Sequence, residues 1–146
     1  MARGMADLSR RLRAIPGIVE AEVRAQLERE ATKLVADMNL VKPFPAIEIG
    51  WTWGDAPAGA YALARSGNDG RIRVTIYATA KTEEFPGGFS AVARWFEFGT
   101  GERVTKTGAR RGRITPQPYF FPVWRANSSR VQGNLRRAIT RGVKKA

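Results

Sequence analysis

The segment that decides the fold runs from Trp95 to Pro122 and reads WFEFGTGERVTKTGARRGRITPQPYFFP. It begins with aromatic residues that lead into a glycine turn, and it ends with aromatic residues held between prolines. Between Val104 and Ile114 it contains no large apolar side chain, so this interior cannot be buried in a monomer. We therefore expect two structured ends joined by a flexible basic loop over residues 103–115.

The two ends have recognisable local chemistry. Gly99 predicts a turn with a positive φ angle that a side chain would block, and Thr100 can hydrogen-bond within the turn that it begins. Pro118 and Pro122 restrict the backbone on either side of an aromatic pair. One interpretation is that these residues only pack the last helix onto a sheet.

Apolar residues at steps of three and four predict two long helices. One covers residues 17–38, and the other runs from Pro122 to about Gly142. Because Pro16 stands directly before the first helix, residues 1–16 are predicted to form a separate N-terminal extension.

The region between the helices predicts strands. Residues 46–54 and 71–80 alternate between apolar and polar side chains, and residues 61–65 offer a weaker strand. Residues 91–98 are predicted to be a helical or extended approach into a further strand that carries their aromatic side chains. The fold class is therefore α+β: a long N-terminal helix and a C-terminal helix packed on a small antiparallel sheet of three to four strands. The whole chain, residues 1–146, is predicted to be one domain.

The positive charge is confined to the C-terminal part of the chain. The net charge of the 146 residues is +12, yet residues 1–102 hold 13 Lys/Arg against 13 Asp/Glu. Residues 103–146 hold 12 Lys/Arg and no acidic residue. A solvated basic tail is one explanation, but so complete a segregation favours a polyanionic partner or an acidic protein surface.

The composition argues against most enzymatic chemistry. The chain has neither cysteine nor histidine, so it lacks thiol chemistry, the usual general base and the commonest metal ligand. The pair Glu83–Glu84 is better explained as a solvated loop, and GTGERVTKTG lacks the spacing of a phosphate-binding loop. We expect no catalytic residue, no cofactor and no metal. No apolar run is long enough to span a membrane, and the N-terminus lacks a signal-peptide pattern, which predicts synthesis in the cytosol and no membrane partner.

Two motifs resemble the head–tail joining family of long-tailed bacteriophages, the tail-completion or neck proteins. They are ARWFEFGTG at 93–101 and PQPYFFPVW at 116–124. In that family a strand ends in an acidic residue followed by Phe/Tyr-Gly-Thr, and after a variable loop a Pro-aromatic-x-x-Pro segment opens the last helix. The matching residues are Glu97, Phe98, Gly99, Thr100, Pro118, Tyr119, Phe120 and Pro122. Gln117 departs from the pattern, because relatives often carry arginine there.

The resemblance implies a structural virion protein of a phage or phage-like particle, assembled in the bacterial cytoplasm. It would form a homo-oligomeric ring, six-fold like the tail tubes of that family, and would act as tail terminator, tail-completion protein or both. The implied partners are further copies of the chain, the tail-tube protein, the head connector or stopper protein, and genome DNA passing non-specifically through the channel. The motif residues would lie at the ring interface. The loop would reach a neighbouring copy, the next ring or the DNA through Arg103, Lys106, Arg110, Arg111 and Arg113.

Two other functions remain open from the residues alone. One is a free, non-specific nucleic-acid-binding protein whose basic C-terminal helix lies on phosphates, although no helix-turn-helix or base-stacking motif is present. The other is a small basic ribonuclease toxin that acts through Arg, Lys and Tyr.

Overall fold

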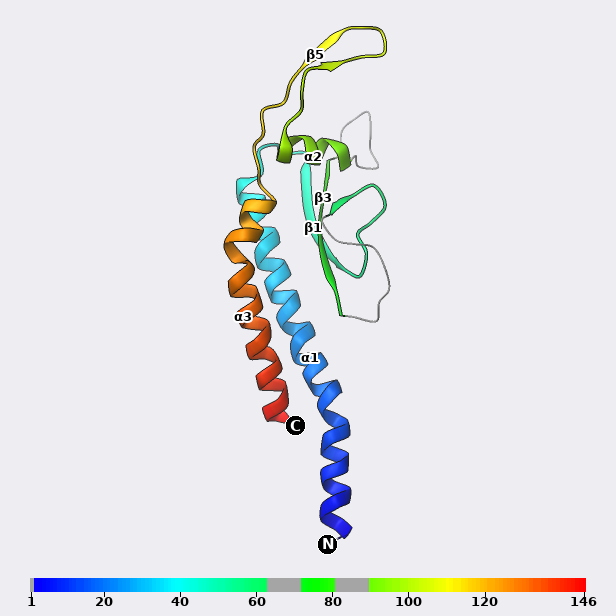
Figure 1. The fold of residues 1–146 in the computed structure, drawn as a ribbon, viewed down its shortest axis with the longest axis vertical. Helices are drawn as coiled ribbons and strands as arrows, with labels where there is room; N and C mark the ends of the chain where they lie inside the picture. Colours follow the sequence, from blue (N-terminus) through cyan, green and yellow to red (C-terminus); the bar gives the residue numbers. More distant parts are fainter. Residues whose placement is uncertain (1, 63–71, 81–89) are drawn as a thin grey trace. The chain divides into compact units, whose positions relative to one another are not determined.

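The computed structural model describes residues 2–62, 72–80 and 90–146. The elements in chain order are α1 (Ala2–Val41), β1 (Ile47–Trp53), β2 (Tyr61–Ala62), β3 (Val74–Ala80), α2 (Ser90–Phe98), β4 (Arg103–Val104), β5 (Arg110–Gly112) and α3 (Phe121–Lys145) (Figure 1). The predicted α+β class is confirmed. The chain divides into two compact units, one of residues 1–30 with 127–146 and one of residues 31–126, and both long helices contribute to each unit.

Helix α1 is longer than the sequence predicts. It begins at Ala2 and continues through Pro16, so the separate N-terminal extension predicted for residues 1–16 is wrong. A proline inside a helix removes one backbone hydrogen bond and crowds the preceding turn, at a cost of about 3 kcal/mol. This penalty is local, and the helical turns on either side of the exposed Pro16 side chain propagate past it.

The main sheet is antiparallel with strand order β1-β3-β2. β1 pairs with β3 along its whole length, from Ile47 opposite Ala80 to Trp53 opposite Val74. The strands predicted over 46–54 and 71–80 are thus confirmed, with β3 shorter at its start. β2 is confirmed as a strand only at Tyr61–Ala62, because residues 63–65 lie outside the described residues.

The hydrophobic core of the 31–126 unit contains side chains from helices, strands and a loop segment. α1, β1, β3, α2 and the segment before α3 each supply buried side chains. They are Met38, Ile47, Ile49, Ala78, Ala80, Ala93, Tyr119 and Phe120. The aromatic pair that closes the quoted segment is therefore part of this core.

Residues 90–98 form a helix, α2, so the helical alternative predicted for 91–98 is confirmed, while the strand expected to carry its aromatic side chains is wrong. Aromatic residues favour strands, but this preference depends on context. Here Ala93 and Glu97 are buried four residues apart, and Val92 and Phe96 pack against the core. This spacing is that of an amphipathic helix, which overrides the strand preference of the aromatic side chains.

The basic segment forms a two-stranded hairpin of β4 and β5, drawn in yellow-green to yellow in Figure 1. The Thr105 amide donates to the carbonyl of Ala109 (2.8 Å), and the Ala109 amide donates to Thr105 Oγ1 (3.0 Å). The turn includes Gly108 at a φ of 86°. The sequence predicts a flexible loop over residues 103–115. The structure instead has a hairpin here, which is held by backbone hydrogen bonds and by the Thr105 side chain and has no apolar core.

In the other unit, α3 runs antiparallel to the stretch of α1 from Val19 to Glu30. Its buried residues, Val131, Ala138 and Gly142, lie seven and four positions apart and make one stripe. A Cβ atom on Gly142 would lie 2.8 Å from Cα of Val19, so only glycine permits this approach of the two helices. Within the described ranges, none of the helices is long and apolar enough to cross a bilayer.

Candidate functional site

A buried carboxylate joins the two sequence motifs. Glu97 on α2 is only 2% exposed. Its Oε2 accepts hydrogen bonds from the backbone amides of Tyr119 (2.8 Å) and Phe120 (2.9 Å), and its Oε1 accepts one from Phe121 (2.9 Å). These amides lead into and open α3, where amides lack partners within the helix and the helix dipole favours negative charge. Glu97 therefore caps a helix that begins far from it in the sequence.

The turn after α2, at Gly99 and Thr100, contacts the segment that follows the hairpin. Gly99 has a φ of 74°, as the sequence predicts. A Cβ atom there would lie 2.7 Å from Cδ of Pro116 and 2.8 Å from the carbonyl oxygen of Ile114. The Thr100 amide donates to that same carbonyl (2.9 Å), and the Ile114 amide donates to Thr100 Oγ1 (3.0 Å). The segments before and after the hairpin are thus held together by specific backbone contacts.

Tyr119 adds a further, buried contact between α2 and the segment that precedes α3. Its side chain is fully buried, and its hydroxyl donates to the carbonyl of Ala93 (3.0 Å). Burial raises the pKa of Tyr119 well above its ordinary value, and the negative charge of Glu97 raises it further. The Tyr119 hydroxyl therefore stays protonated at neutral pH and keeps donating its hydrogen bond to the backbone. It is not suited to act as an acid or base there.

The eight motif residues differ in their exposure. Glu97, Tyr119 and Phe120 are buried within the subunit and hold its own core. Phe98 is 52% exposed, and Pro118 and Pro122 also lie on the surface. Only this exposed part of the motif is available to another molecule.

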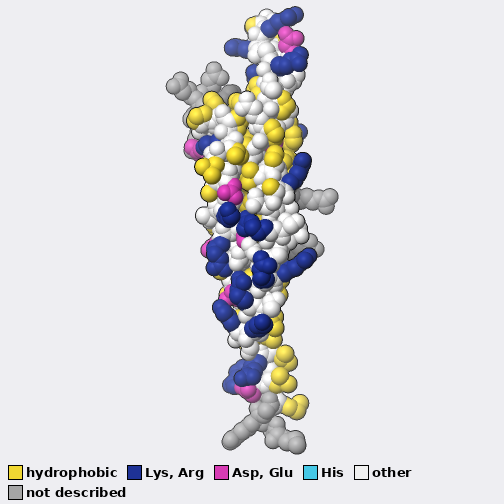
Figure 2. Space-filling model, turned by 90° about the vertical axis from the view of Figure 1, so that its left-hand side faces the viewer, with side chains coloured by type: hydrophobic (Ala, Val, Ile, Leu, Met, Phe, Trp, Pro, Cys, Tyr) yellow, Lys and Arg dark blue, Asp and Glu magenta, His cyan; other side chains and the backbone are white. Residues whose placement is uncertain are grey.

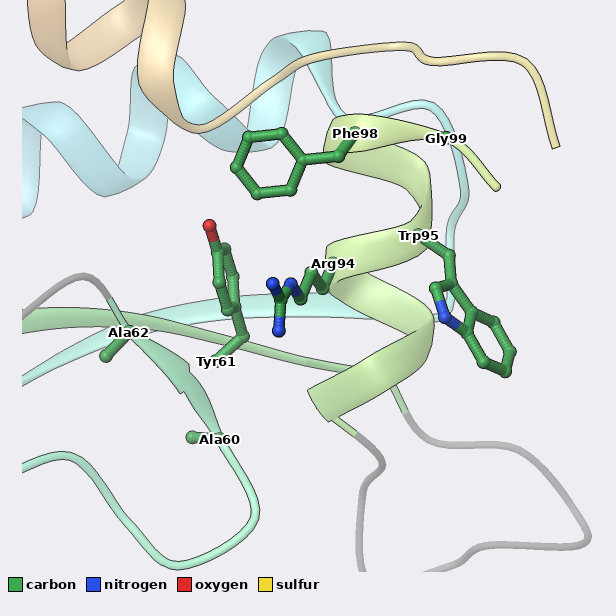
Figure 3. A pocket seen from close by; sticks show the side chains of 7 residues that line it. All are labelled: Ala60, Tyr61, Ala62, Arg94, Trp95, Phe98 and Gly99. Atoms are coloured by element: carbon green, nitrogen blue, oxygen red, sulfur yellow. The ribbon is translucent and has the colours of Figure 1, made fainter. Parts of the chain in front are cut away.

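A pocket of about 470 Å³ lies beside α2 in the same unit (Figure 3). Its larger side chains are Tyr61, Arg94, Trp95 and Phe98, and its small ones are Ala60, Ala62 and Gly99. Figure 3 shows the Arg94 guanidinium beside the Tyr61 ring, while Trp95 points away from that ring. Such walls suit a group that combines a flat apolar part with negative charge.

Tyr61 is half-buried, and its hydroxyl oxygen is the buried polar atom of this pocket. Its hydroxyl has no hydrogen-bond partner in the described part of the chain. Burial raises its pKa to about 12, Glu97 adds to the rise, and Arg94 opposes it. Sequence reasoning selected neither Tyr61 nor Arg94, because they stand on separate elements and no motif links them.

The hairpin presents the basic residues that the sequence singles out. Arg103 lies over the Trp95 ring, 5.2 Å from its centroid, and so ties the hairpin to α2. Arg110 makes an ion pair with Glu102 at 3.5 Å, but both side chains are well exposed, so the pair contributes little to stability. The remaining selected side chains, Lys106, Arg111 and Arg113, are exposed.

Further Lys and Arg side chains gather on α3, which faces the viewer in Figure 2. The exposed ones are Arg125, Arg136, Arg137, Arg141, Lys144 and Lys145. Arg141 and Lys145 both pair with Glu22 of α1, the former at 3.6 Å. Part of the positive charge of α3 is therefore neutralised by the acids of α1.

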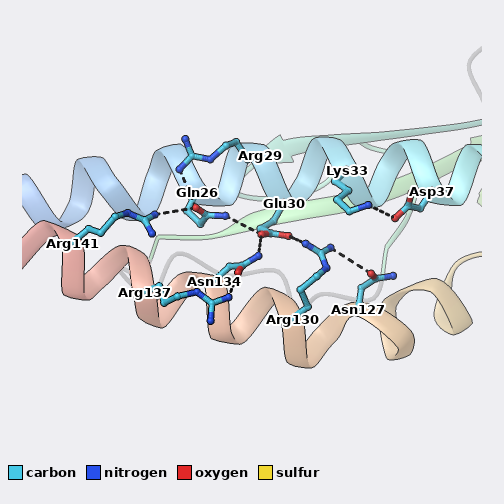
Figure 4. A network of polar contacts seen from close by, with 10 residues as sticks. All are labelled: Gln26, Arg29, Glu30, Lys33, Asp37, Asn127, Arg130, Asn134, Arg137 and Arg141. Carbon is cyan, nitrogen blue, oxygen red and sulfur yellow. Dashed lines mark hydrogen bonds and ion pairs between the residues drawn. The ribbon is translucent and has the colours of Figure 1, made fainter.

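A polar network joins α1 and α3 around Glu30, which is buried (Figure 4). Arg130 donates to Oε2 at 2.7 Å, while Asn134 and Gln26 donate to Oε1. Burial by itself would raise the pKa of Glu30, but these hydrogen bonds and the charge of Arg130 together hold it below the ordinary value of 4.5. The network satisfies the carboxylate and links two helices.

The described residues contain no group of three or more His, Cys, Asp or Glu side chains that could hold a metal ion. No protein-family model matches the sequence, and no curated protein or solved structure is similar to it.

Proposed function

We propose that this chain is a structural protein in the neck of a tailed bacteriophage or phage-like particle. It forms a homo-oligomeric ring that terminates the tail tube or joins the tail to the head connector. The observation that carries the proposal is the bonding of the two family-like motifs to each other. Glu97 caps the segment at 119–121, the Gln117 amide donates to the carbonyl of Phe96, and Thr100 exchanges two hydrogen bonds with Ile114. The two motifs are therefore hydrogen-bonded to each other in the folded chain. This supports the view that they serve one structural role, as the resemblance to the neck proteins implies.

Exposed apolar side chains support a ring. In the 31–126 unit, large apolar residues lie at the surface on several elements. They are Leu40, Val41, Phe44, Ile72, Phe98, Val104 and Trp124. Such residues in number favour a covered interface over a free monomer. Among the described strands, β1 and β2 form the edges of the main sheet, and edges of this kind can pair with another chain.

The basic hairpin supports a role in the assembly. Arg110 and Arg111 lie on β5, Arg113 follows directly, and all three are exposed. They contribute nothing to the subunit's own core, so they are free to contact a neighbouring copy, the next ring or phosphates. A channel that lets DNA pass needs weak, sequence-independent phosphate contacts, which exposed arginines supply.

The same junction favours a non-enzymatic role. The acidic and phenolic groups of the motifs, Glu97 and Tyr119, are both engaged in hydrogen bonds to the backbone. The expected partners are therefore further copies of the chain, the tail-tube protein, the connector or stopper protein and the genome, in the virion. No cofactor enters the proposal.

Native mass spectrometry and electron microscopy test the ring directly. We expect hexameric rings of the purified chain, or rings that form when the tail-tube protein is added. A chain that stays monomeric in both conditions and is absent from purified particles contradicts the proposal.

Replacing Arg110, Arg111 and Arg113 with serine tests the hairpin. The three sites are exposed, so the free energy of unfolding should change by no more than about 0.5 kcal/mol per site. Complementation of a phage that lacks the gene should be impaired. The control variant Arg136→Ser/Lys144→Ser removes positive charge from α3 instead and should complement normally. If the triple variant were fully infectious, the hairpin arginines would have no role in assembly.

A further inference from the structure

Three aromatic rings of the 31–126 unit make a series of contacts. The ring centroids of Tyr61 and Phe98 are 6.4 Å apart, and those of Phe98 and Phe121 are 5.9 Å apart. The residues belong to β2, α2 and the start of α3, so no sequence motif links them and the tertiary structure brings them together. Phe98 is 52% exposed, and Tyr61 and Phe121 are half-buried, which leaves part of the series open to solvent.

An exposed arginine stands at each end of the series. The Arg94 guanidinium lies beside the Tyr61 ring (Figure 3), and that of Arg125 lies over the Phe121 ring, 5.4 Å from its centroid. Glu97, an acid on the same helix as Arg94, is buried and accepts three backbone hydrogen bonds, so it is not displayed beside the rings. We call this surface the aromatic–arginine cluster; its members are Tyr61, Arg94, Phe98, Phe121 and Arg125.

The pocket beside α2 is part of this cluster. Tyr61, Arg94 and Phe98 line it, none of its described lining residues is acidic, and its volume of about 470 Å³ can hold a flat ring. From Gly99, which also lines the pocket, the chain continues into the basic hairpin. The acid between them, Glu102, pairs with Arg110. Residues 103–113 hold five Lys/Arg and no acid, so positive charge continues beyond the pocket along the chain.

We propose that the aromatic–arginine cluster binds single-stranded nucleic acid. Bases stack on the exposed faces of the rings, one of them in the pocket, and Arg94 and Arg125 pair with the phosphates. Each nucleotide supplies a flat ring and a negative charge, which matches a series of rings that ends in guanidinium groups. A duplex is a poorer occupant, because its base faces are already stacked on one another.

A peptide that combines acidic and aromatic side chains is also a less suitable occupant. Basic residues continue from the cluster along the hairpin, and such an extended positive surface suits a polymer that is charged at every unit. The inference does not rest on the proposed ring. It assigns Phe98 to the nucleic acid and leaves the other exposed apolar residues for contacts between copies.

Fluorescence anisotropy of the full chain with labelled probes tests the inference. The probes are an oligothymidine of about twenty nucleotides, an abasic strand of the same length and a duplex of the same length. The abasic strand keeps the phosphates but has no rings to stack. At about 0.2 M salt, where phosphate contacts alone are weak, the oligothymidine should bind at least about tenfold more tightly than either other probe. An oligouridine should bind within about threefold of the oligothymidine, because stacking and phosphate pairing do not involve the sugar.

Variants separate the rings from the charges. Phe98→Leu/Phe121→Leu removes two flat rings but keeps apolar side chains, so it should weaken oligothymidine binding by at least about tenfold and leave binding of the abasic strand unchanged. Arg94→Gln/Arg125→Gln should weaken binding of both strands and make the dependence on salt shallower. The control Phe44→Leu alters a ring that stacks on Phe96, and it should bind oligothymidine like the unchanged chain. Circular dichroism should show the same helix content in all variants.

Crosslinking of the unchanged chain locates the site without any substitution. An oligothymidine that carries one 5-iodouracil should crosslink under ultraviolet light to Tyr61, Phe98 or Phe121, as mapped by mass spectrometry. Crosslinks confined to other residues, or equal affinity for the oligothymidine and the abasic strand, overturn the proposal. A peptide of alternating glutamate and phenylalanine that binds more tightly than the oligothymidine, and loses this binding in Phe98→Leu/Phe121→Leu, overturns it as well.

Discussion

Glu97 shows how one side chain can hold together two segments that are distant in the sequence. A buried carboxylate is normally unfavourable, since it loses its hydration. Here three backbone amides replace the water, and each would itself be a buried donor without a partner if the carboxylate were absent. The acid and the amides therefore stabilise each other, and the entry into α3 is set by a residue of α2.

Glu97→Gln should lower the free energy of unfolding by about 2–3 kcal/mol, because an amide has one acceptor oxygen and no charge for the three donors. Urea denaturation measures the loss. Glu102→Gln is the control, since Glu102 makes only an exposed ion pair with Arg110 and its loss should be below about 0.5 kcal/mol. Equal stability of the two variants would show that the cap contributes nothing.

Gly99→Ala should destabilise the chain by about 1–3 kcal/mol, since the site has a positive φ and the added carbon would meet Pro116 and the Ile114 carbonyl. Gly101 is two residues away, has no positive φ, and has open space at its Cβ position. Gly101→Ala should be neutral or stabilising by up to about 1 kcal/mol. Thermal melts of both variants decide, and a Gly99→Ala variant that melts no lower than Gly101→Ala contradicts the expected strain.

At the scale of elements, α1 and α3 meet through polar groups as much as apolar ones. The buried apolar residues of α3 in this unit are small, Val131 and Ala138, and Gly142 brings the helices close. Glu30 with Arg130 and Asn134 supplies the polar part of the contact. Such a network contributes to stability only while its carboxylate is charged.

The stability of the chain should therefore fall in acid, in part through Glu30. Its folded pKa is lower than its unfolded pKa, so the unfolded state takes up the proton first as the pH drops. The contribution is complete above the unfolded value near 4.5 and is lost as the pH falls through the lower folded pKa. Chemical denaturation between about pH 6 and about pH 3 should show a shallower decline for Glu30→Gln than for the unchanged chain.

The exposed site Glu28 provides the control for that variant. At neutral pH, Glu28→Gln should change stability by no more than about 0.5 kcal/mol, whereas Glu30→Gln should be clearly less stable. Parallel pH curves for Glu30→Gln and the unchanged chain would mean that the network does not contribute.

At the scale of the whole molecule, the distribution of charge governs which partners the chain meets. The net charge of +12 comes entirely from residues 103–146, which include the hairpin and α3. Acids of α1 neutralise part of α3 through Glu22 and Glu30. The hairpin arginines keep most of their charge exposed to solvent, where it can attract phosphates.

Binding to DNA should therefore be weak, independent of sequence and steeply dependent on salt. The logarithm of the binding constant should fall with the logarithm of the salt concentration by about 0.9 per phosphate contacted. The Arg110→Ser/Arg111→Ser/Arg113→Ser variant should show a shallower slope. Fluorescence anisotropy with two duplexes of different sequence measures both effects. Tight binding of only one duplex would favour a free nucleic-acid-binding protein instead.

Much of the fold followed from local patterns in the sequence. Alternation over 46–54 and 71–80 predicted β1 and β3, and the three-to-four spacing predicted the long helices. Gly99 was correctly expected at a positive φ. These features were predictable because periodicity and backbone preference act between near neighbours, whatever the rest of the chain does.

The junction itself was decided by the tertiary structure. The sequence marked Glu97 and Tyr119 as motif residues, but only the folded chain places the carboxylate at the amides that open α3. Local patterns left residues 91–98 open between a helical and an extended approach into a strand, and burial of Ala93 and Glu97 selects the helix. They also gave no sign of the pocket between Tyr61 and Arg94. The physical reason is that burial and hydrogen bonding between distant segments depend on how the chain closes, and no local pattern specifies that closure.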